Sequence, residues 1–256
     1  MADKWRYLED DGCTASLGLA TDEYLARNLP SSPYFHTLRL YTYGEQCALV
    51  GKYQEVSPGI NVEYCKAQGM AINRRPTGGG AIVMGKGQLG VAIAVPLSED
   101  FSFLKLAMVF ERYSRGILLG LARLGLRGEF RPRNDILVGG KKIAGLAFAT
   151  IGEAGLFHAS LLVDIDEEVV QRTLQIPPSK RASLTTVSRG MGRVVTTQET
   201  RQAVKEGYKD AFGMELVNKP LSQEERKGIE FLEESKYRNT TWIYGQRSVH
   251  AESCLY

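Results

Sequence analysis

The sequence predicts an α+β protein in which a mixed or antiparallel sheet is wrapped by helices. Stretches of strand-like composition follow one another with only short turns between them, which favours antiparallel or mixed pairing over a doubly wound parallel sheet. One long helical pattern interrupts this series at Leu104–Leu124, and the last quarter of the chain is helical in pattern. The chain of 256 residues contains no internal repeat. We therefore expect one domain, residues 1–256, with a helical C-terminal portion from about residue 196 to 256.

The N-terminal half is predicted to alternate irregularly between helices and strands. Thr14–Asn28 is expected to be a helix, because Leu17, Tyr24 and Leu25 fall on one side of it. The next predicted elements are a hairpin of Leu38–Tyr43 and Cys47–Gly51 around Gly44-Glu45, a short helix at Asn61–Gln68, and strands at Ala71–Arg74, Ala81–Met84 and Leu89–Val95. Glycine-rich turns, Gly78-Gly79-Gly80 and Gly85-Lys86-Gly87, separate the last three strands.

The second half is predicted to open with the long helix and to continue with a run of strands. These are Asp135–Val138, Lys142–Thr150 and Leu156–Val163, the first two joined by a Gly139-Gly140 turn. Thr196–Glu199 and Ser222–Glu225 have the spacing of a capping box, and each begins a helical pattern. Gly213 is expected to end the first of these helices, and the charged segment Glu224–Tyr237 is expected to lie on the surface.

Composition and charge exclude several classes of protein. The 32 basic and 29 acidic side chains give a net charge of +3 with no basic block, so we expect no nucleic-acid partner. The most apolar stretch, 101–126, contains charged residues, so no membrane association is expected, and the polar start of the chain has no secretory signal. The four cysteines are scattered without CxxC spacing, which favours neither a disulfide framework nor a zinc site and is typical of a cytoplasmic protein.

The segment Arg74–Ala81, which contains three consecutive glycines between two predicted strands, is the strongest functional signal. Consecutive glycines cost backbone entropy and are useful where the main chain must pass close to a ligand. The adjacent guanidinium groups of Arg74 and Arg75 indicate an anionic ligand, a phosphate or a carboxylate. A flexible turn with solvated arginines explains these residues equally well when they are considered alone.

The segment Asn134–Gly145 is the second signal. A polar Asn134-Asp135 pair begins a strand, two glycines turn the chain, and Lys142 begins the returning strand. In such a hairpin Asp135 is placed to bind Mg²⁺ while a lysine reaches the same pocket, and a mobile ammonium suits a phosphate whose charge changes during reaction. The alternative is that Lys141 and Lys142 only keep a hairpin soluble.

Together these segments resemble the lipoate–protein ligase branch of the biotin/lipoate ligase and lipoyl/octanoyl transferase superfamily. That family carries an Arg-Arg-x-Ser/Thr-Gly-Gly-Gly-Ala lipoate loop, here Arg74–Ala81, and an Asn-Asp-strand-turn-Lys element, here Asn134–Gly145. Cys47–Tyr53 and Leu156–Leu162 are also typical. The resemblance covers roughly residues 35–190. It implies a fold like that of class II aminoacyl-tRNA synthetase and biotin ligase catalytic domains, and two half-reactions: lipoate and ATP form lipoyl adenylate, which a lysine of a lipoyl-carrier protein or domain then attacks.

The resemblance also implies a set of site residues. Lys142 is the expected catalytic residue. The residues expected to bind lipoate or the acyl adenylate are Arg74, Arg75, Thr77, Gly78, Gly79, Gly80, Ala81, Gly145 and His158. Those expected to bind the nucleotide and Mg²⁺ are Asn134, Asp135, Ser183, Thr185 and Thr186, the last three in a loop, Pro177–Gly192, that suits closure over an adenylate. His158 is expected to position substrate, although a histidine in an apolar strand is more often structural.

Two departures from the family pattern leave alternatives open. Met84-Gly85 stand where relatives commonly have His-Asp, which puts the acyl substrate or the partner in doubt. An octanoyl transferase needs a thiol near the family lysine, and residues 124–162 contain none, which disfavours that alternative. The complete set of polar motif residues disfavours the other alternative, a non-catalytic acyl-binding protein. Only 246–256 follow a segment that resembles the junction to the family's small accessory domain. Either this tail suffices or a separate accessory-domain protein assists transfer, and we expect the second.

Overall fold

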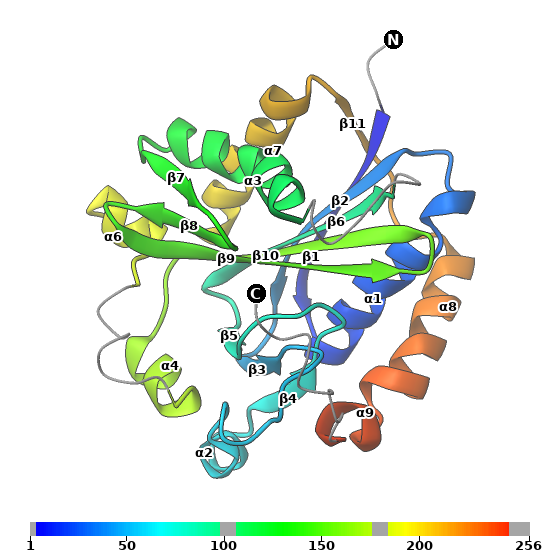
Figure 1. Ribbon diagram of the computed structural model, residues 1–256, viewed down its shortest axis with the longest axis vertical. Helices are drawn as coiled ribbons and strands as arrows, with labels where there is room; N and C mark the ends of the chain where they lie inside the picture. Colours follow the sequence, from blue (N-terminus) through cyan, green and yellow to red (C-terminus); the bar gives the residue numbers. More distant parts are fainter. Residues whose placement is uncertain (1–3, 98–105, 176–183, 246–256) are drawn as a thin grey trace.

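The computed structural model describes residues 4–97, 106–175 and 184–245. Its largest element is an eight-stranded mixed sheet (Figure 1). The first strand, β1 (Lys4–Cys13), runs parallel to its two neighbours, while the other strands of this sheet pair antiparallel. In spatial order the strands are β11 (Glu215–Asn218), β1, β2 (His36–Tyr43), β6 (Gln88–Pro96), β10 (Ala154–Leu162), β9 (Lys141–Ile151), β8 (Asp135–Val138) and β7 (Gly128–Arg131).

A second, three-stranded sheet lies beside the large one. Its order is β4 (Ala71–Arg74), β3 (Cys47–Val50) and β5 (Ile82–Met84), with β3 parallel to β4 and antiparallel to β5. Short helices α2 (Val62–Ala67) and α4 (Glu167–Thr173) cover it with an apolar cluster that includes Val50, Ile60 and Leu174. This sheet carries the glycine-rich segment in the connection from β4 to β5.

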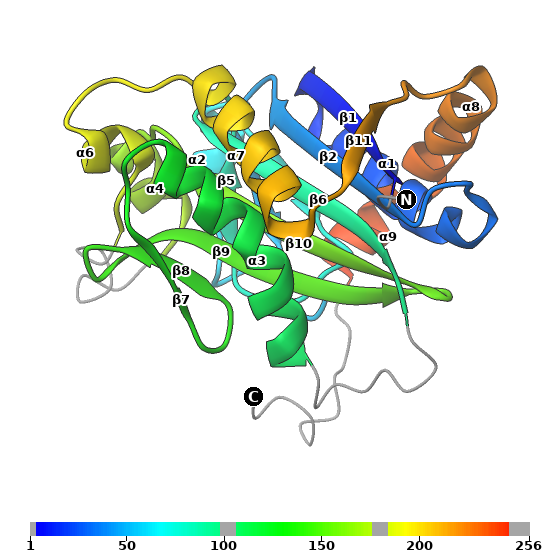
Figure 2. The ribbon, with the colours of Figure 1, turned by 90° about the horizontal axis from the view of Figure 1, so that it is seen from above.

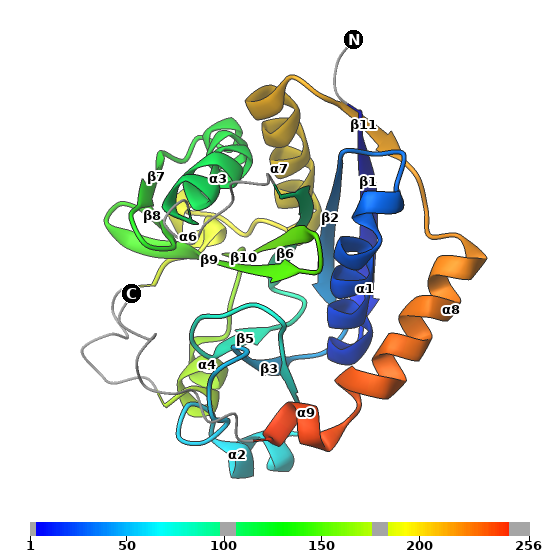
Figure 3. The ribbon, with the colours of Figure 1, turned by 45° about the vertical axis from the view of Figure 1, so that its right-hand side comes forward.

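Two pairs of helices cover the large sheet. Figure 2 shows α3 (Leu106–Arg123) and α7 (Thr197–Phe212) side by side on one face, where Ile117 and Tyr208 pack on Val91 and other strand residues. Figure 3 shows α1 (Ala15–Arg27) beside α8 (Gln223–Leu232) on the other face. The chain then continues through η3 (Glu233–Tyr237) to α9 (Thr240–Tyr244), and the remaining short helices are η1 (Leu29–Ser31) and α6 (Val187–Met191).

Most predicted elements are confirmed because their determinants are local. The long helix, the two short helices at 14–28 and 61–68, and the strands from 71 to 163 appear within a few residues of their predicted bounds. Gly139 and Gly140 both have positive φ angles, 57° and 75°, as the tight turn requires. Ser222 and Glu225 form a full capping box. At the other predicted box the Thr196 hydroxyl accepts from Glu199 N–H, but the Glu199 carboxylate pairs with Arg193 and not with the Thr196 backbone.

One prediction about the N-terminal region was wrong, and one strand there was not predicted. Leu38–Tyr43 and Cys47–Gly51 do not form a hairpin, since β2 belongs to the large sheet and β3 to the small one. β2 instead pairs with β1 and β6 and is buried along its whole length. The polar N-terminal segment is strand β1, whose charged side chains are matched by distant partners: Arg6 by Glu225, Asp10 by Arg39 and Asp11 by Arg201. Strands β7 and β11 were not predicted either.

Candidate active site

A cavity of about 230 Å³ lies between the three-stranded sheet and the β9–β10 part of the large sheet. The segment from β4 to β5 contributes Arg75, Gly79, Gly80 and Ala81 to its wall. The hairpin of β8 and β9 contributes Lys142 and Gly145, with Asn134 just before it. The rest of the wall is mostly apolar and includes Leu19, Tyr41, Leu49, Met84, Leu146, Ala147, Leu162, Ile165, Val170, Leu174 and Leu184. The cavity therefore suits a ligand with one long apolar part and one anionic part.

The glycine-rich segment folds around the side chain of Arg75. The guanidinium donates hydrogen bonds to the carbonyls of Gly78 (2.7 Å), Gly80 (2.8 Å) and Leu49 (3.2 Å). Gly79 has a φ of 92°, and a Cβ there would lie 2.9 Å from Arg75 Nη2, so both backbone conformation and space require glycine. Burial lowers the pKa of Arg75 to about 10, which leaves it charged at neutral pH. Since no carboxylate among the described residues pairs with it, Arg75 is a buried cation facing the cavity.

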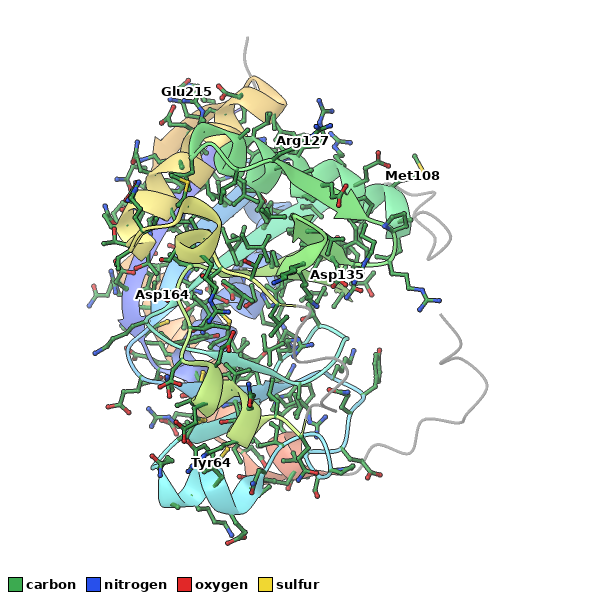
Figure 4. The ribbon with its side chains drawn as sticks, turned by 90° about the vertical axis from the view of Figure 1, so that its left-hand side faces the viewer. Tyr64, Met108, Arg127, Asp135, Asp164 and Glu215 are labelled. Atoms are coloured by element: carbon green, nitrogen blue, oxygen red, sulfur yellow. The ribbon has the colours of Figure 1, made fainter. Side chains whose placement is uncertain are left out.

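Lys142 and Asp135 form an ion pair across the β8–β9 hairpin. Lys142 Nζ lies 2.7 Å from Asp135 Oδ1, and Arg131 binds the other carboxylate oxygen. Burial opposes ionisation of Asp135, but these two cations outweigh it and hold the pKa of the carboxyl below its ordinary value. Figure 4 places Asp135 on the side of the hairpin that faces the three-stranded sheet. The ammonium of Lys142 is thus held at the cavity wall, with about a third of its side chain exposed to solvent.

The segment 184–186 is fastened to the main chain of Lys142. Thr185 N–H donates to Lys142 O at 2.9 Å, and Leu184 makes an isolated bridge to the same residue. Leu184 lines the cavity, whereas Thr185 and Thr186 do not, and the Thr186 hydroxyl caps α6 by accepting from Arg189 N–H. Ser183 lies outside the described residues. Of the predicted loop, Leu184 therefore reaches the cavity, and the predicted nucleotide contacts Thr185 and Thr186 do not line it.

His158 connects the cavity to a buried charge network that sequence reasoning missed. Its Nδ1 lies 3.2 Å from the Thr77 hydroxyl, and its Nε2 lies 3.2 Å from Asp22 Oδ2 on α1. Asp22 is fully buried, and its other carboxylate oxygen, Oδ1, accepts a hydrogen bond from Arg39 at 2.7 Å. Burial raises the pKa of Asp22, but Arg39 and His158 outweigh this and keep it below its ordinary value. The Thr77 hydroxyl is the hydrogen-bond partner of the imidazole, and Nε2 faces the Asp22 carboxylate without a hydrogen bond to it, which fits a positioning role for His158. Thr77 itself is not part of the cavity wall.

Arg74 occupies a place different from the one expected. Its side chain is 1% exposed and is not part of the cavity wall. The guanidinium donates to main-chain carbonyls of two segments, 51–54 and 242–243. Direct contact between Arg74 and a cavity ligand is therefore not supported. Gly78 also does not line the cavity; it supplies a carbonyl to Arg75.

None of the described cysteines is part of the cavity wall, although Cys47 pairs across the small sheet with Met84, which is. Cys13, Cys47 and Cys65 are buried at 6%, 2% and 0% exposure, and none of them lines the cavity. Burial raises the pKa of each thiol, that of Cys13 to about 11. Cys254 lies outside the described residues. Met84 does line the cavity, and its sulfur accepts a hydrogen bond from Ser160 at 2.9 Å, so the position where relatives have histidine is part of the wall.

Within residues 4–97, 106–175 and 184–245 no group of three or more histidine, cysteine or acidic side chains is placed to hold a metal ion. Asp135 is a lone carboxylate, so it fits only a cation whose other ligands come from a bound molecule such as a nucleotide. In the same ranges no helix combines the length and apolarity needed to cross a bilayer.

Comparison with known proteins agrees with this geometry. Residues 14–209 match the family described as lipoyl protein ligase A/B catalytic domain. An octanoyltransferase LipM of Symbiobacterium thermophilum is 28% identical over 94% of this chain and 98% of its own length. Lipoate–protein ligase 1 of Staphylococcus aureus is 28% identical over 90% of this chain and 70% of its own length.

Solved structures extend the likeness to the fold. A lipoate-protein ligase A bound with ATP superposes with a TM-score of 0.84 at 26% identity, covering 96% of this chain and all of that one. A bi-partite lipoate protein ligase from Thermoplasma acidophilum gives 0.85 at 24% identity, over 98% of this chain and all of that one. The predicted α+β class is thereby confirmed. Since the family match spans more than half of its residues, this chain belongs to the lipoyl protein ligase A/B catalytic domain family.

Proposed function

We propose that this chain is an ATP-dependent lipoate–protein ligase. In this proposal it joins lipoate to AMP and then transfers the lipoyl group to a lysine of a lipoyl-carrier protein or domain in the cytoplasm. One observation carries the proposal: the cavity combines the cations of Arg75 and Lys142 with a long apolar wall and has no thiol among its described lining residues. Such a wall suits an acyl chain with an ionised carboxylate, activated by a phosphate and not by a cysteine.

The first half-reaction needs charge stabilisation more than it needs a base. A carboxylate oxygen of lipoate attacks the α-phosphorus of ATP, the bond to the β-phosphate breaks, and pyrophosphate leaves. Lipoate is already ionised, so no proton has to be removed. Arg75, Gly79, Gly80 and Lys142 all line the cavity. In this proposal Arg75 and the main chain of Gly79 and Gly80 hold the acyl carboxylate, and the ammonium of Lys142 stabilises the negative charge that develops on the α-phosphate.

Mg²⁺ belongs to this proposal as a partner of the nucleotide. Asp135, with Asn134 beside it, would hold the ion together with oxygens of the triphosphate. The ion would neutralise phosphate charge when bound. Lys142, which pairs with Asp135 in this structure, lines the cavity and would contact the phosphates.

The second half-reaction requires exclusion of water and access for the acceptor. The neutral amine of the carrier lysine attacks the acyl carbonyl, an amide bond forms, and AMP leaves with its bonding electrons. The segment 184–186, tied to Lys142 by the Thr185–Lys142 hydrogen bond, is part of the wall that covers the adenylate.

An octanoyltransferase is the second candidate, because LipM relatives align over nearly their whole length. This alternative transfers an acyl group from a carrier protein without ATP and, in the family, through a cysteine thioester. The absence of cysteine from the described cavity wall argues against it.

The two candidates are separated by incubating the purified chain with a lipoyl domain and one acyl source at a time. Lipoate with MgATP should give lipoylated domain and AMP, and omission of ATP should abolish the product. Product from octanoyl-carrier protein without ATP would instead establish the transferase. A non-catalytic acyl-binding protein would give neither product while still binding lipoate.

We also propose that a separate accessory-domain protein assists transfer. The relative from Staphylococcus aureus is covered over only 70% of its length, which leaves room there for a further domain. Single-turnover transfer from preformed lipoyl adenylate to a lipoyl domain tests this point. Slow transfer by the chain alone supports an accessory protein, and transfer as fast as adenylate formation contradicts it.

A further inference from the structure

The first arginine of the glycine-rich segment joins two distant parts of the chain. Nη1 of Arg74 donates to the carbonyls of Gly51 (3.0 Å), Lys52 (3.2 Å) and Gln54. Nε and Nη2 donate to the carbonyl of Ile243 (3.1 and 2.9 Å), and Nε also to that of Trp242 (2.9 Å). A planar guanidinium with five donors can bridge two segments in this way, and the ammonium of a lysine cannot.

The C-terminal segment is bound to β4 by further hydrogen bonds. Trp242 Nε1 donates to Arg74 O at 2.9 Å, and the Asn73 side chain donates to Tyr237 O at 2.8 Å. The Tyr237 hydroxyl in turn donates to the buried carboxylate of Glu23 on α1. Figures 1 and 3 show α9 at the end of the chain lying against the small sheet, far in sequence from it. The segment 233–244 is therefore held by both β4 and α1.

On its other side, Arg74 fixes the loop that supports the glycine-rich segment. Lys52 N–H donates to Thr77 O at 2.9 Å, and Arg75 N–H donates to Val50 O at 3.0 Å. The contact is so close that a Cβ on Gly51 would lie 2.1 Å from Gly79 O. The loop 51–54 thus packs directly against the cavity-lining glycines. Arg74 donates hydrogen bonds to three carbonyls of this loop.

We propose that Arg74 is a positioning residue that makes α9 part of the acyl-binding site. A displacement of 242–243 removes acceptors from a buried guanidinium, which then no longer restrains 51–54. The glycine-rich segment loses its support and the cavity loses the fixed backbone that meets the acyl carboxylate. The proposal rests on the proposed ligase function in one respect only, which is that lipoate is used as the ligand that probes the cavity.

The test compares Arg74→Lys and Trp242→Phe with a matched control, Arg6→Lys. Arg6 is also a buried arginine, and it also binds main-chain carbonyls, those of Lys219 and Pro220, together with Glu225. It anchors the C-terminal quarter to β1, and it is not part of the cavity wall. In both cases replacement by lysine keeps the positive charge and removes the planar guanidinium with its several donors. A general loss of stability should therefore affect Arg74→Lys and Arg6→Lys alike.

The first readout is amide hydrogen exchange without any ligand, which does not depend on the proposed activity. Arg74→Lys should speed exchange in a peptide covering 77–83 by about tenfold, and Trp242→Phe by less; Arg6→Lys should leave this peptide unchanged. The second readout is steady-state lipoylation, where Arg74→Lys should raise the KM for lipoate about tenfold with kcat nearly unchanged. An inactive wild-type chain would refute the ligase function while the exchange result still decides this inference.

Equal exchange in all variants, or equal effects of Arg74→Lys and Arg6→Lys on the KM for lipoate, would overturn the proposal. If Arg74→Lys does not fold, Trp242→Phe alone decides it, since that variant removes the hydrogen bond to Arg74 O and keeps an aromatic ring beside Tyr237 and Lys236.

Discussion

The space that Lys142 occupies exists because residue 145 has no side chain. A Cβ on Gly145 would lie 3.0 Å from Lys142 Nζ and 3.2 Å from its Cε. The two residues are in the same strand, β9, and both line the cavity. Gly145 therefore determines where the ammonium can rest.

Gly145→Ala is expected to lower activity without unfolding the protein. The added methyl group meets only the flexible end of Lys142, so the free energy of unfolding should change by less than about 1 kcal/mol. The ammonium must move away from the cavity wall, and kcat for lipoylation should fall by about tenfold or more. Chemical denaturation and steady-state kinetics measure the two effects separately. A variant with normal kcat would show that the position of the ammonium in the ligand-free protein does not matter.

Lys142→Ala should abolish adenylate formation. Loss of a donor to charge that develops in the transition state costs about 3 kcal/mol, roughly a hundredfold in rate. The matched control is Lys141→Ala, since Lys141 is the exposed neighbour in the same hairpin and is not part of the cavity wall. ATP–pyrophosphate exchange with lipoate measures this step alone. Equal rates for the two folded variants would refute the role of Lys142.

His36 should make stability depend on pH in a range where carboxyl groups do not titrate. It is buried against Trp5, and burial, aided by the charge of Arg112, lowers its pKa from 6.5 to about 4. Below pH 6.5 the unfolded chain therefore binds a proton that the folded chain does not, so stability is lost as the pH falls toward 4. Between pH 7 and 5.5 the loss should be about 1 kcal/mol.

His36→Phe tests the sign and the source of this effect. The ring still stacks on Trp5, but it no longer titrates, so the unfolding free energy should be nearly flat between pH 7 and 5.5. Urea denaturation at both pH values gives the comparison. A slope equal to that of the wild type would assign the pH dependence to another group.

The sequence predicts well what is determined locally. The β8–β9 hairpin was expected because two glycines with positive φ suffice to turn it, and it carries Lys142 and Asn134 to the cavity as predicted. The hairpin expected at 38–51 is wrong because the partners of β2 lie elsewhere in the chain: β1 precedes it and β6 follows about fifty residues later. Pairing over such separations leaves no signal in a short window of sequence.

The buried ion pairs were not predicted for the same reason, because their partners are also distant in the sequence. Asp22 appears as an ordinary polar residue in a helical pattern, and Arg39 as a charge in a strand. The network is visible only in the fold, where Asp22 pairs with Arg39 and lies beside His158. Arg74 and Arg75 are adjacent in sequence and were expected to act alike. Arg74 is the last residue of β4 and Arg75 the first residue after it, and their side chains diverge, so Arg75 contacts the cavity and Arg74 the C-terminal segment.

Removal of the thiols is the last prediction. Replacing Cys13, Cys47 and Cys65 by alanine and Cys254 by serine should leave most of the ATP-dependent lipoylation intact. Alanine is preferred at the three buried positions, because a serine hydroxyl there would need a hydrogen-bond partner. Some loss of stability is expected from the smaller side chains, so activity should be measured below the temperature of unfolding.

The result bears directly on the choice between ligase and transferase. An adenylate route needs no thiolate, whereas a thioester route fails completely without its cysteine. Cys254→Ser alone is the informative single change, since the other three thiols are buried, do not line the cavity and have pKa values that burial raises. If that single change removed acyl transfer from a folded protein, the thioester route would replace the adenylate route. Retention of ATP-dependent activity in the four-fold variant leaves Lys142 and Arg75, and not a thiolate, as the groups that act on the activated acyl chain.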